Sequence, residues 1–413
     1  MRFQYLICLA LVLVTSCSSP GGLAENSAEF TVANSLSEPR KDAFFRIAAD
    51  RITKVPGQDW STMKLVAGGE TIPFEAMDTD GDGLSDQLGV LLQMKAGERK
   101  KLTLQALAEG EKAPVFPKRT YAELSHKTGG YWKEREYQEG VFKNVDVLQV
   151  PQEHTDHSWF IRYEGPGWES DLVGYRFYLD WRNANDIFGK KTTEMVLDRV
   201  GQDGFDSYHE PADWGQDILK VGSSLGLGSI ATWTDDHALR VEETDSLACE
   251  VVRNGKLESL IRTNYYGWKV GSVKTNLTAD LSIHAGSRLT KVELNLSNPL
   301  PNLCTGIGKL KNAELLTGGE GDWAYLATWG AQSLAEDNLG MAVLYRKSDL
   351  LELTEDELSH VVVLRPNNNS LNYYFLAAWE QEPGGIKDRA SFLTYLDKTT
   401  RELDAPISAS VSR

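Results

Sequence analysis

The segment 154–183, HTDHSWFIRYEGPGWESDLVGYRFYLDWRN, concentrates side chains that can exchange protons or bind charged ligands. Alternation over 174–182 predicts a strand with an aromatic and aliphatic face, made of Tyr175, Phe177, Leu179 and Trp181. The opposite face carries groups that form hydrogen bonds of fixed geometry, namely Arg176, Tyr178, Asp180 and Arg182. This face is either a buried arginine–aspartate network between two sheets or the lining of a site.

Two histidines at the start of this segment favour a site. His154 and His157 are three residues apart and are followed by Trp159 and Arg162. Imidazoles exchange protons near neutral pH, and an arginine binds carboxylates through two parallel hydrogen bonds. A shared transition metal, bound by His154, His157, His209 and a nearby aspartate, is an open alternative.

A second cluster lies in DGFDSYHEPADWGQDILKVG, residues 203–222. Tyr208 and His209 are neighbours that can serve as a general acid and base. Trp214, with Trp168 of the first segment, can stack on the apolar face of a sugar ring. Lys127 belongs to a basic and aromatic patch at 126–138, which predicts an anionic ligand such as a uronic acid or a sugar sulfate.

The segment DTDGDGLSD resembles a compact calcium loop. Its carboxylates alternate around two glycines, as hard-oxygen coordination of Ca²⁺ requires, and they are Asp78, Asp80, Asp82 and Asp86. A solvated acidic turn between two strands is the alternative. We expect a structural rather than a catalytic ion here.

The N-terminus has the pattern of a bacterial lipoprotein signal. A basic residue precedes an apolar run that is too short to span a bilayer, and VTSC ends at Cys17. We therefore expect a signal peptide at 1–16, lipidation of Cys17 and a flexible tether at 17–27. These features predict an outer-membrane lipoprotein, on the periplasmic side because no acidic run follows the cysteine.

Bulk properties narrow the class of protein. The net charge of -16 and pI of about 5.0 argue against a nucleic-acid partner, which needs clustered basic charge. The only cysteines left to pair after cleavage, Cys249 and Cys304, form either one disulfide or two buried thiols.

The periodicity predicts a mainly β protein. Residues 28–108 form a small N-terminal β-sandwich, 109–131 a linker, and 132–413 a large antiparallel β-domain. Strands are predicted in EFTVANSL, KKLTLQAL, NLTADLSIHAG and LTKVELNLSN. Short helices are predicted in TTEMVLDRVG and ADWGQDILKVG, each ending at a glycine.

Several of these strings together resemble the DUF4861 family of bacterial lipoproteins. The resemblance rests on DTDGDGLSDQL, KTGGYW, residues 153–183, DGFDSYHEPADWGQDILKVG and LGLGSIA. It implies a galactose-mutarotase-like supersandwich for the large domain. It also implies association with the degradation of uronic-acid polysaccharides such as ulvan and pectin, and it assigns no catalytic residue.

The leading hypothesis is β-elimination on uronic-acid oligosaccharides by a carbon–oxygen lyase or dehydratase. His157 or His209 would take the C5 proton, Tyr208 would protonate the leaving oxygen, and Arg162, Arg176 or Arg182 would bind the carboxylate. The expected substrate-binding set is His154, Trp159, Trp168, Arg176, Tyr178, Asp180, Arg182, Trp214 and Lys127. The alternatives are a glycoside hydrolase using two carboxylates among Asp180, Glu164, Asp206 and Glu210, a mutarotase-type epimerase, and a non-catalytic glycan-binding lipoprotein.

Overall fold

The computed structural model describes residues 27–52, 58–79, 81–203 and 207–411. The expected signal peptide, Cys17 and nearly all of the tether lie outside these ranges, as do Asp80 and Asp206. None of the helices within the described ranges has the length and apolar composition needed to cross a bilayer.

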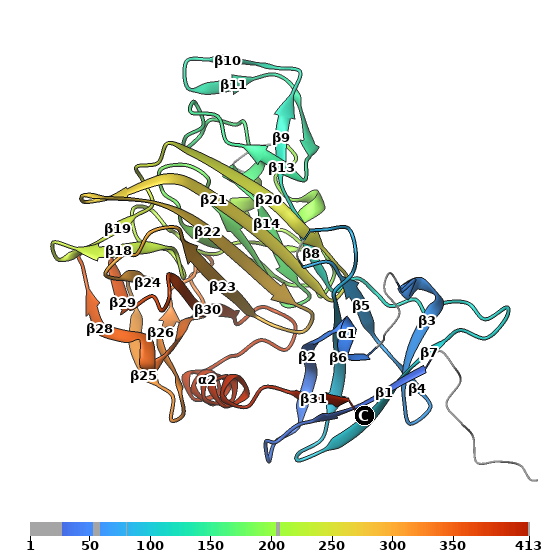
Figure 1. Ribbon diagram of the computed structural model, residues 1–413. Coiled ribbons are helices and arrows are strands. Elements are labelled where there is room, and N and C mark those ends of the chain that lie inside the picture. The colour runs from blue at the N-terminus through green and yellow to red at the C-terminus, as the bar shows by residue number, and fades with distance from the viewer. Residues whose placement is uncertain (1–26, 53–57, 80, 204–206, 412–413) are drawn as a thin grey trace, which may run out of the picture.

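Alternating apolar residues in the N-terminal part build two small antiparallel sheets (Figure 1). Their inner faces form a core of their own around Phe30, Leu65 and Val90. The five-stranded sheet has the order β31 (Ser408–Val411), β1 (Ser27–Ala33), β7 (Arg99–Ala106), β3 (Met63–Ala67) and β4 (Glu70–Ile72). The other has the order β2 (Arg40–Ala48), β6 (Gln87–Met94) and β5 (Phe74–Met77), and the single-turn helix α1 (Ala49–Ile52) follows β2.

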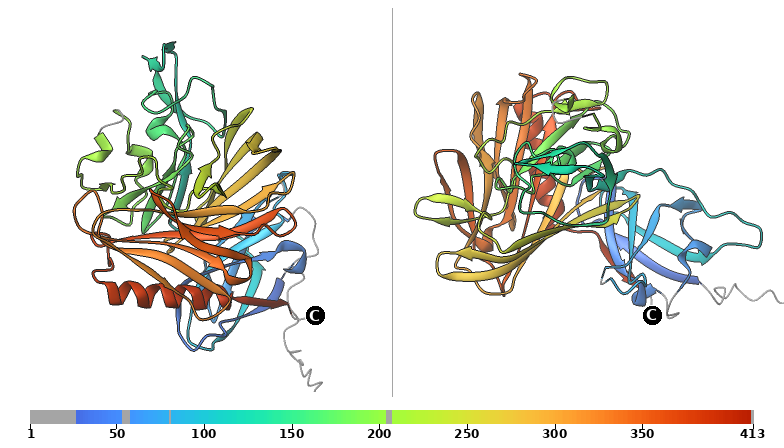
Figure 2. Two further views of the ribbon diagram at one scale, coloured as in Figure 1. Left: turned by 90° about the vertical axis from the view of Figure 1, so that its left-hand side faces the viewer. Right: turned by 90° about the horizontal axis from the view of Figure 1, so that it is seen from above.

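A nine-stranded antiparallel sheet dominates the rest of the chain (Figures 1 and 2). Its order begins with β13 (Val147–Gln149), β20 (Ser246–Asn254), β21 (Glu258–Val270), β22 (Val273–His284) and β23 (Leu289–Leu296). It continues with β30 (Ser370–Trp379), β27 (Asn338–Arg346), β26 (Trp323–Ala331) and β25 (Ala313–Gly318).

Two five-stranded sheets pack against one face of the nine-stranded sheet. One has the order β17 (Gly215–Asp217), β16 (Asn185–Lys190), β15 (Val173–Phe177), β14 (Gly167–Ser170) and β8 (Thr120–Glu123). The other has the order β19 (His237–Arg240), β18 (Ala231–Thr234), β24 (Leu303–Gly308), β29 (Ser359–Leu364) and β28 (Leu350–Glu355). The largest apolar core lies between these layers. The predicted mainly β, antiparallel sandwich architecture is confirmed.

The helix α2 (Arg389–Asp404) covers the other face of the large sheet, where Phe392 and Leu396 are fully buried. Burial of each such side chain stabilises the fold by about 1.5–3 kcal/mol. Asp388 caps the helix by accepting the Ser391 N–H at 2.8 Å. After the helix the chain returns to the N-terminal sheet, because β31 pairs with β1.

Two small hairpins project beside the sandwich. They pair β10 (Tyr131–Lys133) with β11 (Glu136–Gln138), and β12 (Val141–Asn144) with β9 (Ser125–Thr128). Strands β8 and β9 both lie within 109–131, so this segment, expected to be a linker, contributes to the large domain. Short 3-10 turns cover Trp60–Thr62, Arg162–Glu164, Leu197–Arg199, Ser207–His209 and Lys347–Asp349.

Both predicted helices in the middle of the chain are wrong. The segment 192–201 contains only the turn at Leu197–Arg199, and 212–222 contains strand β17. Cys249 and Cys304 are buried free thiols, so of the two alternatives for this pair the disulfide is excluded. Burial raises the pKa of the Cys249 thiol to about 12.

Candidate functional site

The polar face of β15 is sealed inside the sandwich. Arg176 is 1% exposed and donates hydrogen bonds to Asp186 at 2.7 Å, to Asp217 at 2.5 Å and to the Tyr208 hydroxyl at 2.7 Å. The Tyr178 hydroxyl also donates to Asp186. The structure therefore contains the buried network, and Arg176 and Tyr178 are not positioned to bind a substrate as expected.

Two buried carboxylates share the charge of Arg176. Burial, together with the negative charge of Asp217, raises the pKa of Asp186 to about 6, although Arg176 opposes the shift. His209 approaches this pair, with its Nε2 3.3 Å from Asp217 Oδ2. Tyr208 is buried, and burial raises its pKa, so its proton is bound more tightly than that of a free tyrosine.

Arg162 and Arg182 are also bound by acidic side chains of the protein. Arg162 is buried and forms an ion pair with Glu123. Arg182 binds Asp180, Glu164 at 2.8 Å and Asp156 at 3.0 Å. Each arginine that was expected to bind a substrate carboxylate already forms an ion pair with a carboxylate of the protein. The arrangement expected for elimination is therefore absent from these residues.

The expected stacking platform at Trp168 is wrong, because this ring is fully buried and its Nε1 donates to Thr290 Oγ1 at 2.8 Å. Trp214 is half-buried, and its ring edge packs against Phe188. Lys127 lies on β9 over the Phe142 ring, in the hairpin region next to the site.

One part of the predicted segment does reach the surface. The His157 pocket, a hollow of about 350 Å³, is lined by Arg135, Glu136, Thr155, Asp156, His157 and Trp181. His157 Nδ1 lies 2.9 Å from Asp156 Oδ1, and the His157 side chain is 55% exposed. Glu136 and Arg135 reach the pocket from the β10–β11 hairpin, so two different elements supply carboxylates to one hollow.

The loop beneath this pocket has an unusual backbone. His157, Trp159, Tyr163 and Glu164 all have positive φ, between 38° and 71°, although none is glycine. Such conformations cost free energy and cluster where function requires a fixed geometry. Glu164 is buried below Asp156, and its Oε1 accepts the His157 backbone N–H at 3.2 Å.

His154 lies inside the loop rather than in the pocket. Its Nδ1 is 2.8 Å from Ser158 Oγ, its Nε2 is buried without a hydrogen-bond partner in the described chain, and burial lowers its pKa. Trp159 is half-buried with its ring edge-on to His157. Neither residue lines the His157 pocket.

The described residues that could hold a transition metal are Asp156, His157 and Glu164, whose ligand atoms lie within 4.8 Å of one another. His209 belongs to the Arg176 network instead. One imidazole and two carboxylates suit zinc, but the Arg182 guanidinium already binds both carboxylates. A dication would have to displace this guanidinium, so the residues do not fit a metal.

In the acidic loop, the described aspartates bind backbone amides. Asp78 accepts from Gly81 and Gly83 at 2.7 and 2.8 Å, and Asp82 accepts from Leu84 at 2.8 Å. Asp86 accepts from Thr79 at 2.7 Å. These bonds fold the loop into a tight turn, and calcium binding there stays a prediction.

The pocket residues missed by reasoning from the sequence include Asp156, Glu136 and Trp181. Asp156 sits between the two histidines and was visible as a candidate. Trp181 was placed on the apolar face of a strand, but β15 ends at Phe177 and the following turn leaves the indole 46% exposed.

Comparison with known proteins gives a family and a distant likeness in structure. Residues 32–409 match the model of the family described as domain of unknown function DUF4861. The chain is similar to a protein in the glycosyl hydrolase family 38 from Enterococcus faecalis, with 9% identity, a TM-score of 0.46 and coverage of 94% of this chain and 48% of that one. It is also similar to an alpha-mannosidase from Enterococcus faecalis V583, with 10% identity, a TM-score of 0.45 and coverage of 95% and 46%.

The chain thus spans about half the length of these solved structures. The search of curated proteins found no relative. The prediction of a carbon–oxygen lyase is contradicted, because the two similar structures are described as a glycosyl hydrolase family member and a mannosidase and neither as a lyase. The physical reason within this chain is that Arg162, Arg176 and Arg182 are neutralised by its own carboxylates.

Proposed function

The chain belongs to the DUF4861 family, whose model matches residues 32–409, and we propose that it is a carbohydrate-active hydrolase. We propose the His157 pocket as its site. One observation carries the proposal: carboxylates from two separate elements line one hollow beside an exposed indole, above a loop with four strained non-glycine residues.

Glycoside hydrolysis needs one group to protonate the leaving oxygen and a carboxylate to activate water or attack the anomeric carbon. Asp156 is the second group, because His157 and Arg182 hold it in position and stabilise its negative charge. Glu136 reaches the same pocket from the hairpin and acts as the acid. His157 and Glu164 are positioning residues for Asp156 and Arg182.

The substrate is proposed to be an anionic oligosaccharide of the uronic-acid type. Trp181 offers a partly exposed indole for a sugar ring. Arg135 offers a cation at the pocket, and its guanidinium also donates to Thr155 Oγ1 at 3.0 Å. We further propose that the protein is anchored by lipid at Cys17 on the periplasmic side of the outer membrane, which is supported by the VTSC signal alone.

The test is product analysis with the purified protein on oligogalacturonate, glucuronan and ulvan oligosaccharides. Hydrolysis produces new reducing ends without absorbance near 235 nm, where an unsaturated uronate absorbs. A rise at 235 nm would mean elimination and would overturn the proposal.

The second candidate function is glycan binding without catalysis. It is favoured by Arg182, whose guanidinium forms ion pairs with both Asp156 and Glu164 and so neutralises them. Retarded migration in a glycan-containing gel, with no new reducing ends from any of the three substrates, would select this function instead.

A further inference from the structure

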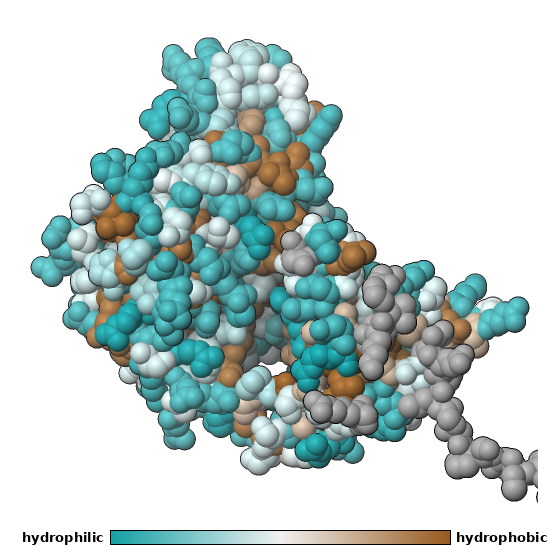
Figure 3. Space-filling model, viewed as in Figure 1, coloured by the Kyte–Doolittle hydropathy of each residue, from teal (hydrophilic) through white to brown (hydrophobic). Residues whose placement is uncertain are grey.

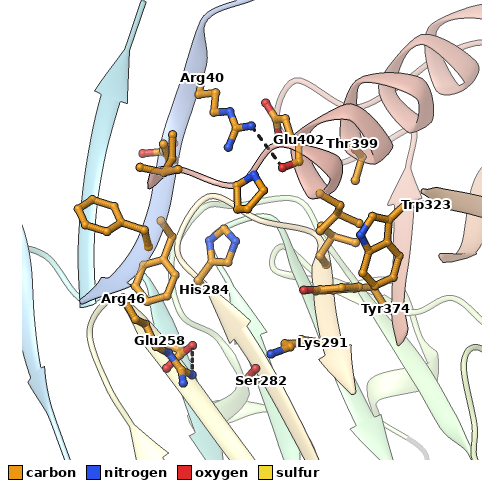
Figure 4. A pocket seen from close by; sticks show the side chains of 18 of the residues that line it. Arg40, Arg46, Glu258, Ser282, His284, Lys291, Trp323, Tyr374, Thr399 and Glu402 are labelled. Carbon is orange, nitrogen blue, oxygen red and sulfur yellow. Dashed lines mark hydrogen bonds and ion pairs between the residues drawn. The ribbon is translucent and has the colours of Figure 1, made fainter. Parts of the chain in front are cut away.

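A second, larger cavity separates the small N-terminal sheets from the large sheet. It measures about 500 Å³ and lies between β2, the ends of β21 to β23 and the C-terminal end of α2 (Figure 4). Figure 3 shows the surface hollowed between these two parts of the molecule. A hollow of this size at a domain boundary fits a ligand of one or two sugar rings.

The charge of this cavity is opposite to that of the protein. Five arginines and lysines line it against three acidic residues, whereas the chain carries a net charge of -16. The basic residues are Arg40, Lys41, Arg46, Lys291 and Arg346, and the acidic ones are Asp42, Glu258 and Glu402.

Two of the three acids are neutralised from outside the cavity. Asp42 accepts two hydrogen bonds from Arg119, at 2.7 and 3.1 Å. Glu258 binds Arg253 at 2.5 Å as well as Arg46. Neither Arg119 nor Arg253 lines the cavity, and neither does Glu293, which pairs with Lys291 at 2.7 Å. After these outside partners are counted, the cations of the cavity still outnumber its acids.

A buried cation with an unsatisfied donor supports the same conclusion. Arg40 is 7% exposed, and its guanidinium donates to the carbonyl of Glu402 at 3.2 Å and to that of Ala405. No carboxylate within the described ranges forms an ion pair with it, and its Nε is buried without an acceptor among those residues. Burial of an unpaired donor costs free energy, which an anionic ligand would recover.

Flat aromatic rings border the cations. Phe44 stacks on His284 with ring centroids 5.1 Å apart, and Trp323 meets Tyr374 edge to face at 5.1 Å. Arg346 lies over the Trp323 ring at 4.7 Å. Figure 4 shows His284 in the middle, with Arg40 on one side and Trp323 and Tyr374 on another. Cations beside ring faces match a ligand with a carboxylate and an apolar ring face.

We propose that this cavity is a second binding site, distinct from the His157 pocket, for a carboxylate-bearing mono- or disaccharide. The ligand bridges the N-terminal sheets and the large sheet, since residues from both line the cavity. This inference stands on the cavity alone and does not require the proposed hydrolase activity.

The test measures binding of digalacturonate by isothermal titration calorimetry, with neutral galactobiose as the uncharged probe. Lys291→Met and Arg346→Gln each remove one cation from the cavity. Lys269→Met is the matched control, because Lys269 and Lys291 lie on the same sheet and each pairs with one glutamate, at 2.9 and 2.7 Å. Thermal unfolding verifies that all variants are folded.

We expect each cavity variant to bind digalacturonate about five- to tenfold more weakly, as loss of one partly exposed charged contact implies. Lys269→Met should bind as the wild type does, and galactobiose should bind much more weakly than digalacturonate. Wild-type affinity in both cavity variants, an equal loss of affinity in Lys269→Met, or no wild-type binding at millimolar ligand would each overturn the proposal.

Discussion

The raised pKa of Asp186 in the buried Arg176 network gives a quantitative prediction. Burial and the charge of Asp217 raise the pKa of Asp186 to about 6 in the folded protein, from an ordinary value of 3.8. A raised carboxyl pKa means that the folded state binds the proton more tightly than the unfolded state. This stabilisation is fully present below about pH 4 and is lost as the pH rises through about 6. Between pH 4 and pH 7 the loss amounts to about 2–3 kcal/mol.

Asp186→Asn removes this titration, because the amide carries no charge at either pH. The assay is urea unfolding of the wild type and the variant at pH 4, 5, 6 and 7. We expect the stability advantage of the wild type to shrink by about 2–3 kcal/mol from the lowest to the highest pH. Asp198→Asn, which changes an exposed carboxylate, serves as the control and should follow the wild type. Parallel curves for the wild type and Asp186→Asn would refute the reasoning.

Two further predictions concern the scaffold. Arg176→Met leaves Asp186 and Asp217 buried without their cation, so we expect the free energy of unfolding to fall by about 3–5 kcal/mol. A variant of normal stability that had lost only activity would show that Arg176 binds the substrate instead. If the acidic loop binds calcium, the melting temperature of the wild type should be higher in excess Ca²⁺ than in EDTA, and that of Asp78→Ala should not differ. An unchanged wild-type melting temperature would mean that the loop is a simple turn.

Local periodicity sufficed to predict most strands, because each buries one face. β1, β7, β22 and β23 fall where the alternation of apolar residues places them. The pairing of β31 with β1 was not predictable, since it joins the two ends of the chain and leaves no local signal. The helix α2 was missed, although Asp388, Phe392 and Leu396 have the spacing of a capped amphipathic helix.

The two wrong helices have a physical explanation in distant partners. The backbone amides of Val196 and Leu197 donate to Glu169, at 2.7 and 2.8 Å, and this buried carboxylate holds the segment as a turn. Gly215–Asp217 pairs with β16 as a strand. In both segments, contacts from elsewhere in the chain override the local helical pattern.

The segment predicted to form the site contributes to the His157 pocket, but most of the residues predicted for the site lie outside this pocket. Residue types could not distinguish a sealed ion network from a pocket, because both use arginine, aspartate and tyrosine. Exposure decides between them: Arg176 and Trp168 are buried, while His157 and Trp181 reach the surface. Glu136 could not be found at all from local spacing, since the β10–β11 hairpin brings it to the pocket.

The most direct measurement is the rate of reducing-end release by Asp156→Asn compared with the wild type on whichever uronic-acid oligosaccharide the wild type cleaves. The amide cannot act as a base or nucleophile, so the rate should fall by about 10²- to 10⁴-fold while the melting temperature changes little. Glu136→Gln should show a comparable fall, and Glu153→Gln, an exposed change in the same loop, should not. Undiminished hydrolysis by folded Asp156→Asn would place the chemistry outside the His157 pocket and contradict the account.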